Sequence, residues 1–184
     1  MRAAKRKQKS DVSIIGTGRL GTTLALALAG SGYTIRSLVS RGRQSARKAA
    51  RLLDADVQVL AAKQLFSLLD ADLFLITVPD DQIARVACEL SEINADRKKV
   101  TALHTSGALS SEVLAPLRED GWNTGSIHPL MSVSAAHDAS LEGAYWSVEG
   151  DRSAVRLGKE IVRDLGGKSF SIQTEESRFT MLRR

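Results

Sequence analysis

Short aliphatic runs alternate with longer stretches of helical periodicity along most of the chain. Such runs predict strands buried on both faces, because β-branched and aliphatic side chains suit a covered sheet. The expected strands are Val12–Ile15, Thr34–Val39, a weaker one at Val57–Leu60, Leu73–Val78, Val100–His104, Thr124–Ile127, 144–149 and Ser169–Ile172. The expected helices are Arg19–Ser31, Arg43–Leu53, a short one near Gln64–Leu69, Asp80–Ile93, Ser110–Glu119 and Arg152–Leu165.

This order of elements predicts the α/β class, with a doubly wound, mostly parallel sheet covered by helices on both faces. A chain of 184 residues is long enough for one such domain. We expect the domain to span residues 11–175. Residues 1–10 are expected to form a basic disordered tail, and 176–184 a short tail after the last strand.

Three glycines follow the first predicted strand and open the first predicted helix. Gly16 permits a tight turn at the strand end, Gly18 lets the backbone approach a pyrophosphate, and Gly21 lets the helix pack close to the strand. The helix N-terminus offers free N–H groups to phosphates. The strand–loop–helix context favours a dinucleotide site in a Rossmann sheet over a glycine-rich turn of another α/β fold. The predicted loop residues are Gly16, Thr17, Gly18, Arg19, Leu20 and Gly21.

The end of the second predicted strand indicates which dinucleotide binds. NAD-specific domains usually place an acid there to hold the ribose hydroxyls, but no Asp or Glu occurs between Asp11 and Asp54. Instead, Ser40 can hydrogen-bond a 2′-phosphate, and Arg41 and Arg43 can bind it by charge and forked geometry. The alternative is a solvated basic helix start. We therefore expect NADP(H) as the cofactor.

Charge and cysteine content exclude several other classes. The formal net charge is +5, but five cations precede Asp11, and the remaining 21 Lys and Arg residues balance 21 Asp and Glu residues. The basic excess belongs to the tail, so nucleic-acid binding is an unfavoured third alternative. A lone cysteine, Cys88, fits a reducing, cytoplasmic location. No run approaches the roughly 20 apolar residues that span a membrane, so no membrane association is expected.

Three polar segments follow later strands, where the ligands of such sheets bind. The first contains Val78, Pro79 and Asp80, which we assign to the cofactor site. The others are His104-Thr-Ser-Gly-Ala-Leu109 and Ser126-Ile-His-Pro-Leu-Met131. We expect all three to converge on the nicotinamide end of the cleft.

The glycine loop and these segments, together with Val148-Glu-Gly-Asp151, resemble NADP-dependent Rossmann-like oxidoreductases with a second domain of unknown function. These proteins are often described as deazaflavin-dependent NADP oxidoreductase-like. The resemblance covers nearly the whole chain from residue 11. More distantly, the layout is similar to pyrroline-5-carboxylate reductase and prephenate dehydrogenase.

The resemblance implies hydride transfer between NADP(H) and a carbonyl or imine carbon of a small, unidentified substrate. By analogy, His128 or His104 serves as proton donor, because histidine titrates near neutral pH. Ser106 then hydrogen-bonds the substrate or the nicotinamide amide. The structural alternatives are that His104 caps a buried strand end and that His128 anchors a loop before Pro129. No metal is expected, since the three histidines lack a usual ligand spacing.

The family continues with a helical domain that dimerises and covers the active site, which implies a homodimer. The residues after 176 do not resemble the start of that domain. Two hypotheses follow. The first is an NADP(H)-dependent oxidoreductase, or the cofactor-binding half of one. The second is a non-catalytic NADP(H)-binding module, which is either a remnant or a sensor. Site closure matters because it excludes water and positions substrate.

Overall fold

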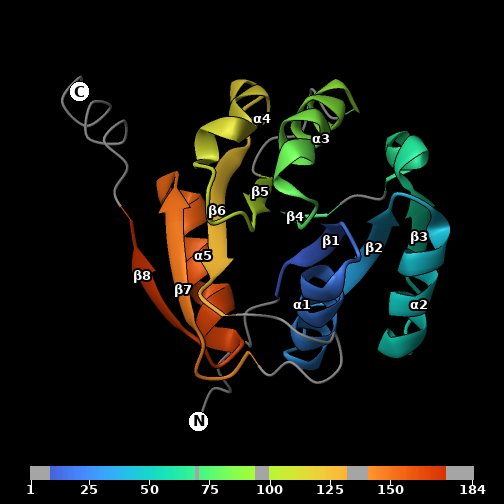
Figure 1. The fold of residues 1–184 in the computed structure, drawn as a ribbon, viewed down its shortest axis with the longest axis horizontal. Coiled ribbons are helices and arrows are strands. Elements are labelled where there is room, and N and C mark those ends of the chain that lie inside the picture. Colours follow the sequence, from blue (N-terminus) through green and yellow to red (C-terminus); the bar gives the residue numbers. More distant parts are fainter. Residues whose placement is uncertain (1–8, 69–70, 94–99, 132–140, 173–184) are drawn as a thin grey trace, which may run out of the picture.

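The computed structural model describes residues 9–68, 71–93, 100–131 and 141–172. Its centre is one eight-stranded sheet in the order β3-β2-β1-β4-β5-β6-β7-β8 (Figure 1). The strands are β1 (Asp11–Ile15), β2 (Thr34–Ser40), β3 (Gln58–Ala61), β4 (Leu73–Ile76), β5 (Thr101–His104), β6 (Asn123–Pro129), β7 (Tyr145–Gly150) and β8 (Lys168–Ser171). The helices are α1 (Arg19–Gly30), α2 (Arg43–Leu53), α3 (Asp80–Ile93), α4 (Ala115–Glu119) and α5 (Arg152–Asp164), with 3₁₀ turns η1 (Ala62–Ser67) and η2 (Ser111–Leu114).

The first six strands are parallel, and the direction reverses at β7. β6 and β7 pair antiparallel, with Ser126 opposite Glu149, and β7 then pairs parallel with β8. The reversal allows a direct return from β6 instead of a helical crossover. The predicted α/β class with a mostly parallel, doubly wound sheet is confirmed.

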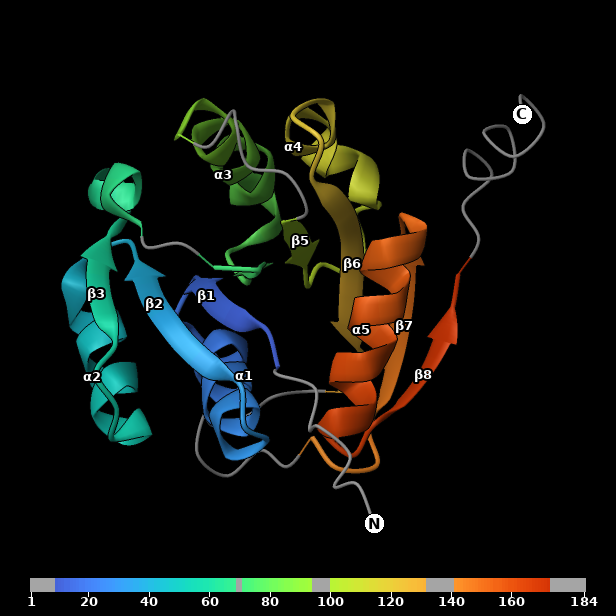
Figure 2. The same cartoon turned by 180° about the vertical axis from the view of Figure 1, so that it is seen from behind.

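Alternate residues of the central strands point into two separate cores. Ile14, Leu73 and Leu75 belong to the core beneath α1, α2 and α5, whereas Phe74 and Ile76 belong to the core beneath α3 and α4. The two views in Figures 1 and 2 show these helices on opposite faces of the sheet. Burial on both faces explains why these strands are almost entirely apolar in sequence.

Most predicted elements occur within one or two residues of their expected bounds, and two expectations need correction. The helix expected over Ser110–Glu119 is divided into η2 and α4. Leu114 has φ −97° and ψ 15°, and Pro116 lies in the first turn of α4, where its missing N–H is tolerated.

The second correction concerns the basic tail. Lys9 is not a solvated tail residue, because its Nζ lies 2.6 Å from Ser31 O and 2.8 Å from Asp164 Oδ2 and sits over the Tyr33 ring. Residues 1–8 and 176–184 lie outside the described residues. Within the described part of the chain, no helix has both the length and the apolar character needed to cross a membrane.

Candidate functional site

The loop between β1 and α1 is held by close contacts that only glycine permits. Gly16 has φ +111°, and a Cβ there would lie 2.6 Å from the backbone of Thr77, the residue that follows the neighbouring strand β4. A Cβ on Gly21 would collide with the Gly16 carbonyl oxygen and lie 2.5 Å from Thr77 Oγ1. The loop therefore packs against the end of β4, and α1 packs against the loop.

The middle of the same loop is open. A Cβ on Gly18 would meet no atom within 4 Å, and Gly18 is exposed as the N-cap of α1. The first turn of α1 contains no acidic residue. No carboxylate of that turn therefore offsets the positive end of the helix dipole and its free N–H groups. Thr17 Oγ1 is buried and has no hydrogen-bond partner among the described residues. These are properties of a loop that binds an anion.

A cleft of about 440 Å³ extends from this loop across the ends of β1 and β2 to helix α3. One part is polar and contains the glycine loop and Thr77. Another part is apolar and is formed by side chains of η1 and the β4–α3 loop and by Val86, whereas the other α3 residues that line the cleft are polar or charged. The lining residues are Ile15, Gly16, Thr17, Gly18, Val39, Ser40, Arg41, Ser45, Ala62, Leu65, Thr77, Val78, Pro79, Gln82, Arg85, Val86 and Glu89.

The three residues predicted at the end of β2 have different surroundings. Arg41 is exposed and lines the cleft. Ser40 also lines it, but its hydroxyl donates to Gly42 O and accepts from Ala46 N, which holds the first turn of α2. Arg43 does not line the cleft; its Nε donates to Gln64 Oε1 at 2.9 Å. Of the three, Arg41 has the position that best suits a phosphate contact.

His104, at the end of β5, is fully buried. Its Nδ1 accepts from Ser106 N at 3.2 Å, and its Nε2 lies 3.3 Å from Ser110 O. These contacts suit a neutral ring with the proton on Nε2. Burial lowers the pKa of His104 to about 4, which the hydrogen bond to Ser110 opposes only in part. The ring therefore bonds to the loop that joins β5 to η2. This arrangement agrees with the alternative in which His104 caps a buried strand end.

His128 and Ser106 lie beside this loop. His128 is half-buried on β6, and its Nδ1 lies 2.9 Å from Thr105 O, so Nδ1 carries the proton of the neutral ring. A Cβ on Gly107 would lie 2.5 Å from His128 Nε2. The buried Ser106 hydroxyl accepts from Ala108 N and Leu109 N at 3.1 Å. His128 is thus the half-exposed histidine of the two predicted as proton donors.

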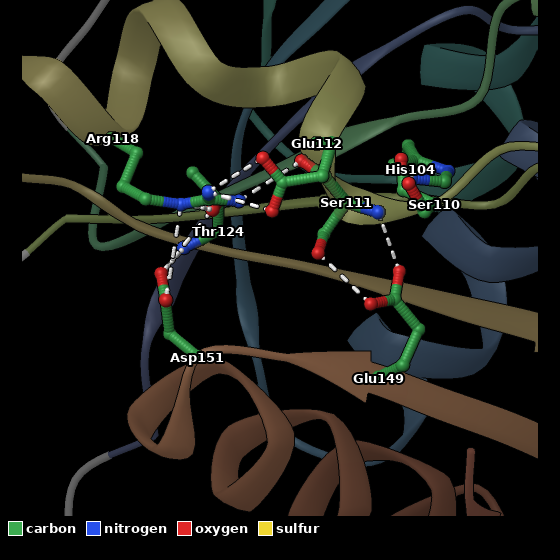
Figure 3. A network of polar contacts seen from close by, with 8 residues as sticks. All are labelled: His104, Ser110, Ser111, Glu112, Arg118, Thr124, Glu149 and Asp151. Carbon is green, nitrogen blue, oxygen red and sulfur yellow. Dashed lines mark hydrogen bonds and ion pairs between the residues drawn. The ribbon is translucent and has the colours of Figure 1, made fainter. Parts of the chain in front are cut away.

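A buried carboxylate from β7 anchors the far end of the same loop (Figure 3). Glu149 accepts from Ser111 N at 2.6 Å and from Ser111 Oγ at 2.9 Å. Burial raises the pKa of Glu149, although the hydrogen bonds from Ser111 lower it. Ser110 occupies the N-cap position of η2 without a side-chain hydrogen bond, and Glu149 accepts the N–H of the first η2 residue, Ser111.

The structure thus divides the predicted site residues into two groups. Gly16, Thr17, Gly18, Ser40, Arg41, Val78 and Pro79 line the cleft, whereas Arg19, Leu20, Gly21, Arg43 and Asp80 do not. His104, Ser106 and His128 also lie outside it, on the β5–η2 loop and β6. Sequence reasoning missed Ser45, Gln82, Arg85 and Glu89. The spacing from 82 to 89 marks one face of α3, but only the fold shows which way that face points.

The mostly parallel sheet with helices on both faces and the glycine loop after β1 define an α/β domain of the Rossmann type. The chain belongs to the Rossmann-like domain family, which matches residues 2–129. Among curated proteins, none matches the sequence.

Solved structures share the fold. A protein from Bacteroides fragilis described as an NADP oxidoreductase superposes with a TM-score of 0.76 at 19% identity, covering 96% of this chain and 65% of that one. Prephenate dehydrogenase from Aquifex aeolicus gives 0.74 at 19% identity, with coverage of 96% and 64%. A Thermotoga maritima protein gives 0.68 at 25% identity, with coverage of 94% and 61%. The chain spans less than two thirds of each of these proteins.

Proposed function

We propose that the protein binds NADP(H) and serves as an oxidoreductase, or its cofactor-binding half, that transfers hydride to or from a small carbonyl or imine substrate. The observation that carries this proposal is the cleft, lined by both the open glycine loop and Arg41. The prephenate dehydrogenase neighbour was solved with NAD⁺, and the Bacteroides fragilis neighbour is described as an NADP oxidoreductase. Both descriptions support a nicotinamide dinucleotide as the ligand.

The cleft fits the parts of this cofactor in order. The backbone at Gly16–Gly18 and the start of α1 would hold the pyrophosphate, with Thr17 Oγ1 as a further hydrogen-bonding group. Arg41 and Ser45 would hold the 2′-phosphate. Ser45 is exposed in the first turn of α2, a helix whose first turn contains no acid and whose N-cap is Gly42. This arrangement favours a phosphate over a ribose hydroxyl.

His128 is the residue that we assign to proton transfer. The bound cofactor would supply the hydride. Because Nδ1 donates to Thr105 O, Nε2 is the nitrogen that can accept or release a proton. Ser106 would help to fix the loop that borders this ring. His104, with its pKa near 4 and full burial, is better suited to holding that loop than to donating protons at neutral pH.

Titration with NADPH and NADH tests the cofactor assignment. The wild-type protein should bind NADPH tightly and NADH weakly. Arg41→Ala should weaken NADPH binding by roughly 10- to 100-fold, because a charge-assisted contact contributes about 1.5–3 kcal/mol. NADH affinity should change less than about twofold, since NADH has no 2′-phosphate. The matched control is Arg47→Ala, an exposed arginine of α2 outside the cleft lining.

Two outcomes would contradict the assignment. Equal losses of NADPH and NADH affinity in Arg41→Ala would show that Arg41 does not contact the 2′-phosphate. Failure of the wild-type protein to bind either nucleotide would show that neither is its cofactor. The second candidate function is a non-catalytic NADP(H)-binding module, favoured by the position of His128 and Ser106 outside the cleft. Tight NADPH binding without oxidation of NADPH across a panel of cyclic imines and keto acids would support that module.

A further inference from the structure

Helix α3 presents one face to the cleft at a distance from the glycine loop. Gln82, Arg85, Val86 and Glu89 line the cleft, and their spacing places them on two successive turns of one side of the helix. None of these residues contributes to the phosphate contacts described above. They form the α3 wall of the cleft.

The Arg85 guanidinium is held by its edges. Its Nε donates to Gln82 Oε1 at 3.2 Å, and its Nη1 donates to Glu89 Oε1 at 2.9 Å as an i,i+4 ion pair. Because the guanidinium is planar, hydrogen bonds within its plane leave its two faces available for stacking. The Arg85 side chain is 56% exposed, so a ligand can reach it.

The neighbouring part of the cleft is apolar. Leu65 and Val86 are each 4% exposed, and Val78 is half-buried between the phosphate loop and α3. A slot with aliphatic walls and a flat cationic side chain at its rim suits an uncharged, planar heterocycle.

We propose that Arg85 binds the adenine ring of the dinucleotide by stacking its guanidinium face on the base, while Gln82 and Glu89 fix the orientation of that face. This inference rests on the proposed function, because it assigns a residue to the adenosine end of the same cofactor. Arg85 is a binding residue here and not a catalytic one. The ligand class that it recognises is a purine nucleotide.

Binding of cofactor fragments to four variants tests the inference. The probes are NADPH, adenosine 2′,5′-bisphosphate and reduced nicotinamide mononucleotide, and the variants are Arg85→Ala, Arg85→Lys, the double variant Arg85→Ala/Glu89→Gln, and Arg156→Ala. Arg85→Ala should weaken both adenine-containing probes by about 5- to 10-fold. Affinity for the nicotinamide mononucleotide should stay unchanged, because it lacks the base. Arg156 is an exposed arginine of α5, and its variant should bind like wild type.

The other variants separate stacking from charge. Arg85→Lys keeps the charge but loses the plane, so it should bind the adenine probes nearly as weakly as Arg85→Ala. The double variant also removes the charge of the Glu89 carboxylate, which Arg85→Ala alone would leave in the cleft without its ion pair. It should also stay weak.

Each alternative gives a distinct result. Wild-type affinity in Arg85→Lys would show that only charge matters, and wild-type affinity in the double variant would show that Glu89 repulsion caused the loss. Either result overturns the stacking role. NADPH binding that is equal in wild type and Arg85→Ala also overturns it while the proposed function stands. Failure of the wild-type protein to bind NADPH overturns the proposed function itself.

Discussion

Particular polar side chains near the glycine loop and near β5, β6 and β7 have different surroundings. Around the glycine loop, the buried Thr17 hydroxyl has no partner among the described residues, and Arg41 is exposed at the mouth of the cleft. Around β5, β6 and β7, the buried His104 and Glu149 side chains are hydrogen-bonded to the chain itself. Figure 3 shows Glu149 bonded to Ser111, with His104 and Ser110 nearby on the same loop.

This difference separates a ligand site from its scaffold. A buried polar group without a partner destabilises the fold unless a ligand or water binds it, whereas a group bonded within the chain stabilises one conformation. The cleft therefore has the character of a binding surface. His104 and Glu149 hold the loop that contains Ser106 through separate hydrogen bonds, His104 to Ser106 N and Glu149 to Ser111.

The largest effect is expected from the close packing behind the cleft. Gly21→Ala places a Cβ against the Gly16 carbonyl oxygen and 2.5 Å from Thr77 Oγ1, so α1 must move away from the loop. We expect the free energy of unfolding in urea to fall by about 3 kcal/mol or more, because overpacked backbone has no room to relax. NADPH binding should be lost together with it.

Gly30→Ala is the matched control in the same helix. A Cβ at Gly30 would meet no atom within 4 Å, and alanine is the better helix former. This variant should be as stable as wild type or slightly more stable. A Gly21→Ala protein with wild-type stability would show that the glycine loop and α1 are not tightly packed. It would contradict the difference between close packing at Gly16 and Gly21 and open space at Gly18.

Local spacing explains why the cleft was predictable from the sequence and the second region was not. Gly16, Gly18 and Gly21 lie within six residues, and their roles follow from the strand and helix on either side. The strands were predictable because Leu73–Ile76 and similar runs are buried on both faces. The helix face that contains Arg85 needed the three-dimensional position of α3.

Contacts between distant residues account for the remaining differences. Gln64 is 21 residues from Arg43, yet it binds the guanidinium and draws it from the predicted phosphate site. Glu149 is 38 residues from Ser111, and its position depends on the reversal of direction at β7. No local pattern encodes either pairing, because side-chain partners across a sheet are set by strand order and register.

A smaller effect is expected from acid, and it arises in the scaffold region. The folded protein keeps His104 neutral down to a pKa of about 4, whereas the unfolded chain takes up the proton near its ordinary value of 6.5. Protonation thus favours unfolding as the pH falls below 6.5. Linkage gives a loss of about 2 kcal/mol between neutral pH and pH 5 from this residue. Urea denaturation across that range measures it.

His104→Gln should remove this part of the pH dependence, although it is expected to lower stability at neutral pH because Ser106 N loses its acceptor. His128→Gln is the control, because it removes the other histidine of this region and leaves the His104 ring in place. If both variants keep the full acid loss, His104 does not supply it. The region around His104 would then not be the source of the loss of stability in acid.

The smallest effect concerns the carboxylate that supports the loop from β7. Burial raises the pKa of Glu149 in the folded protein, so folding favours its protonated form, and its contribution to stability declines as the pH rises above the ordinary value of 4.5. Glutamine keeps a carbonyl oxygen for Ser111 and carries no charge. Glu149→Gln should therefore be as stable as wild type at pH 7, or more stable by up to about 1 kcal/mol, and the difference should shrink toward pH 4.5.

The control is Glu112→Gln, which removes an exposed partner of Arg118 and should instead lose up to about 1 kcal/mol of stability at pH 7. A Glu149→Gln protein that is clearly less stable at pH 7 would show that the ionised carboxylate is needed to hold Ser111, and that charge, and not hydrogen bonding alone, distinguishes the scaffold from the cleft.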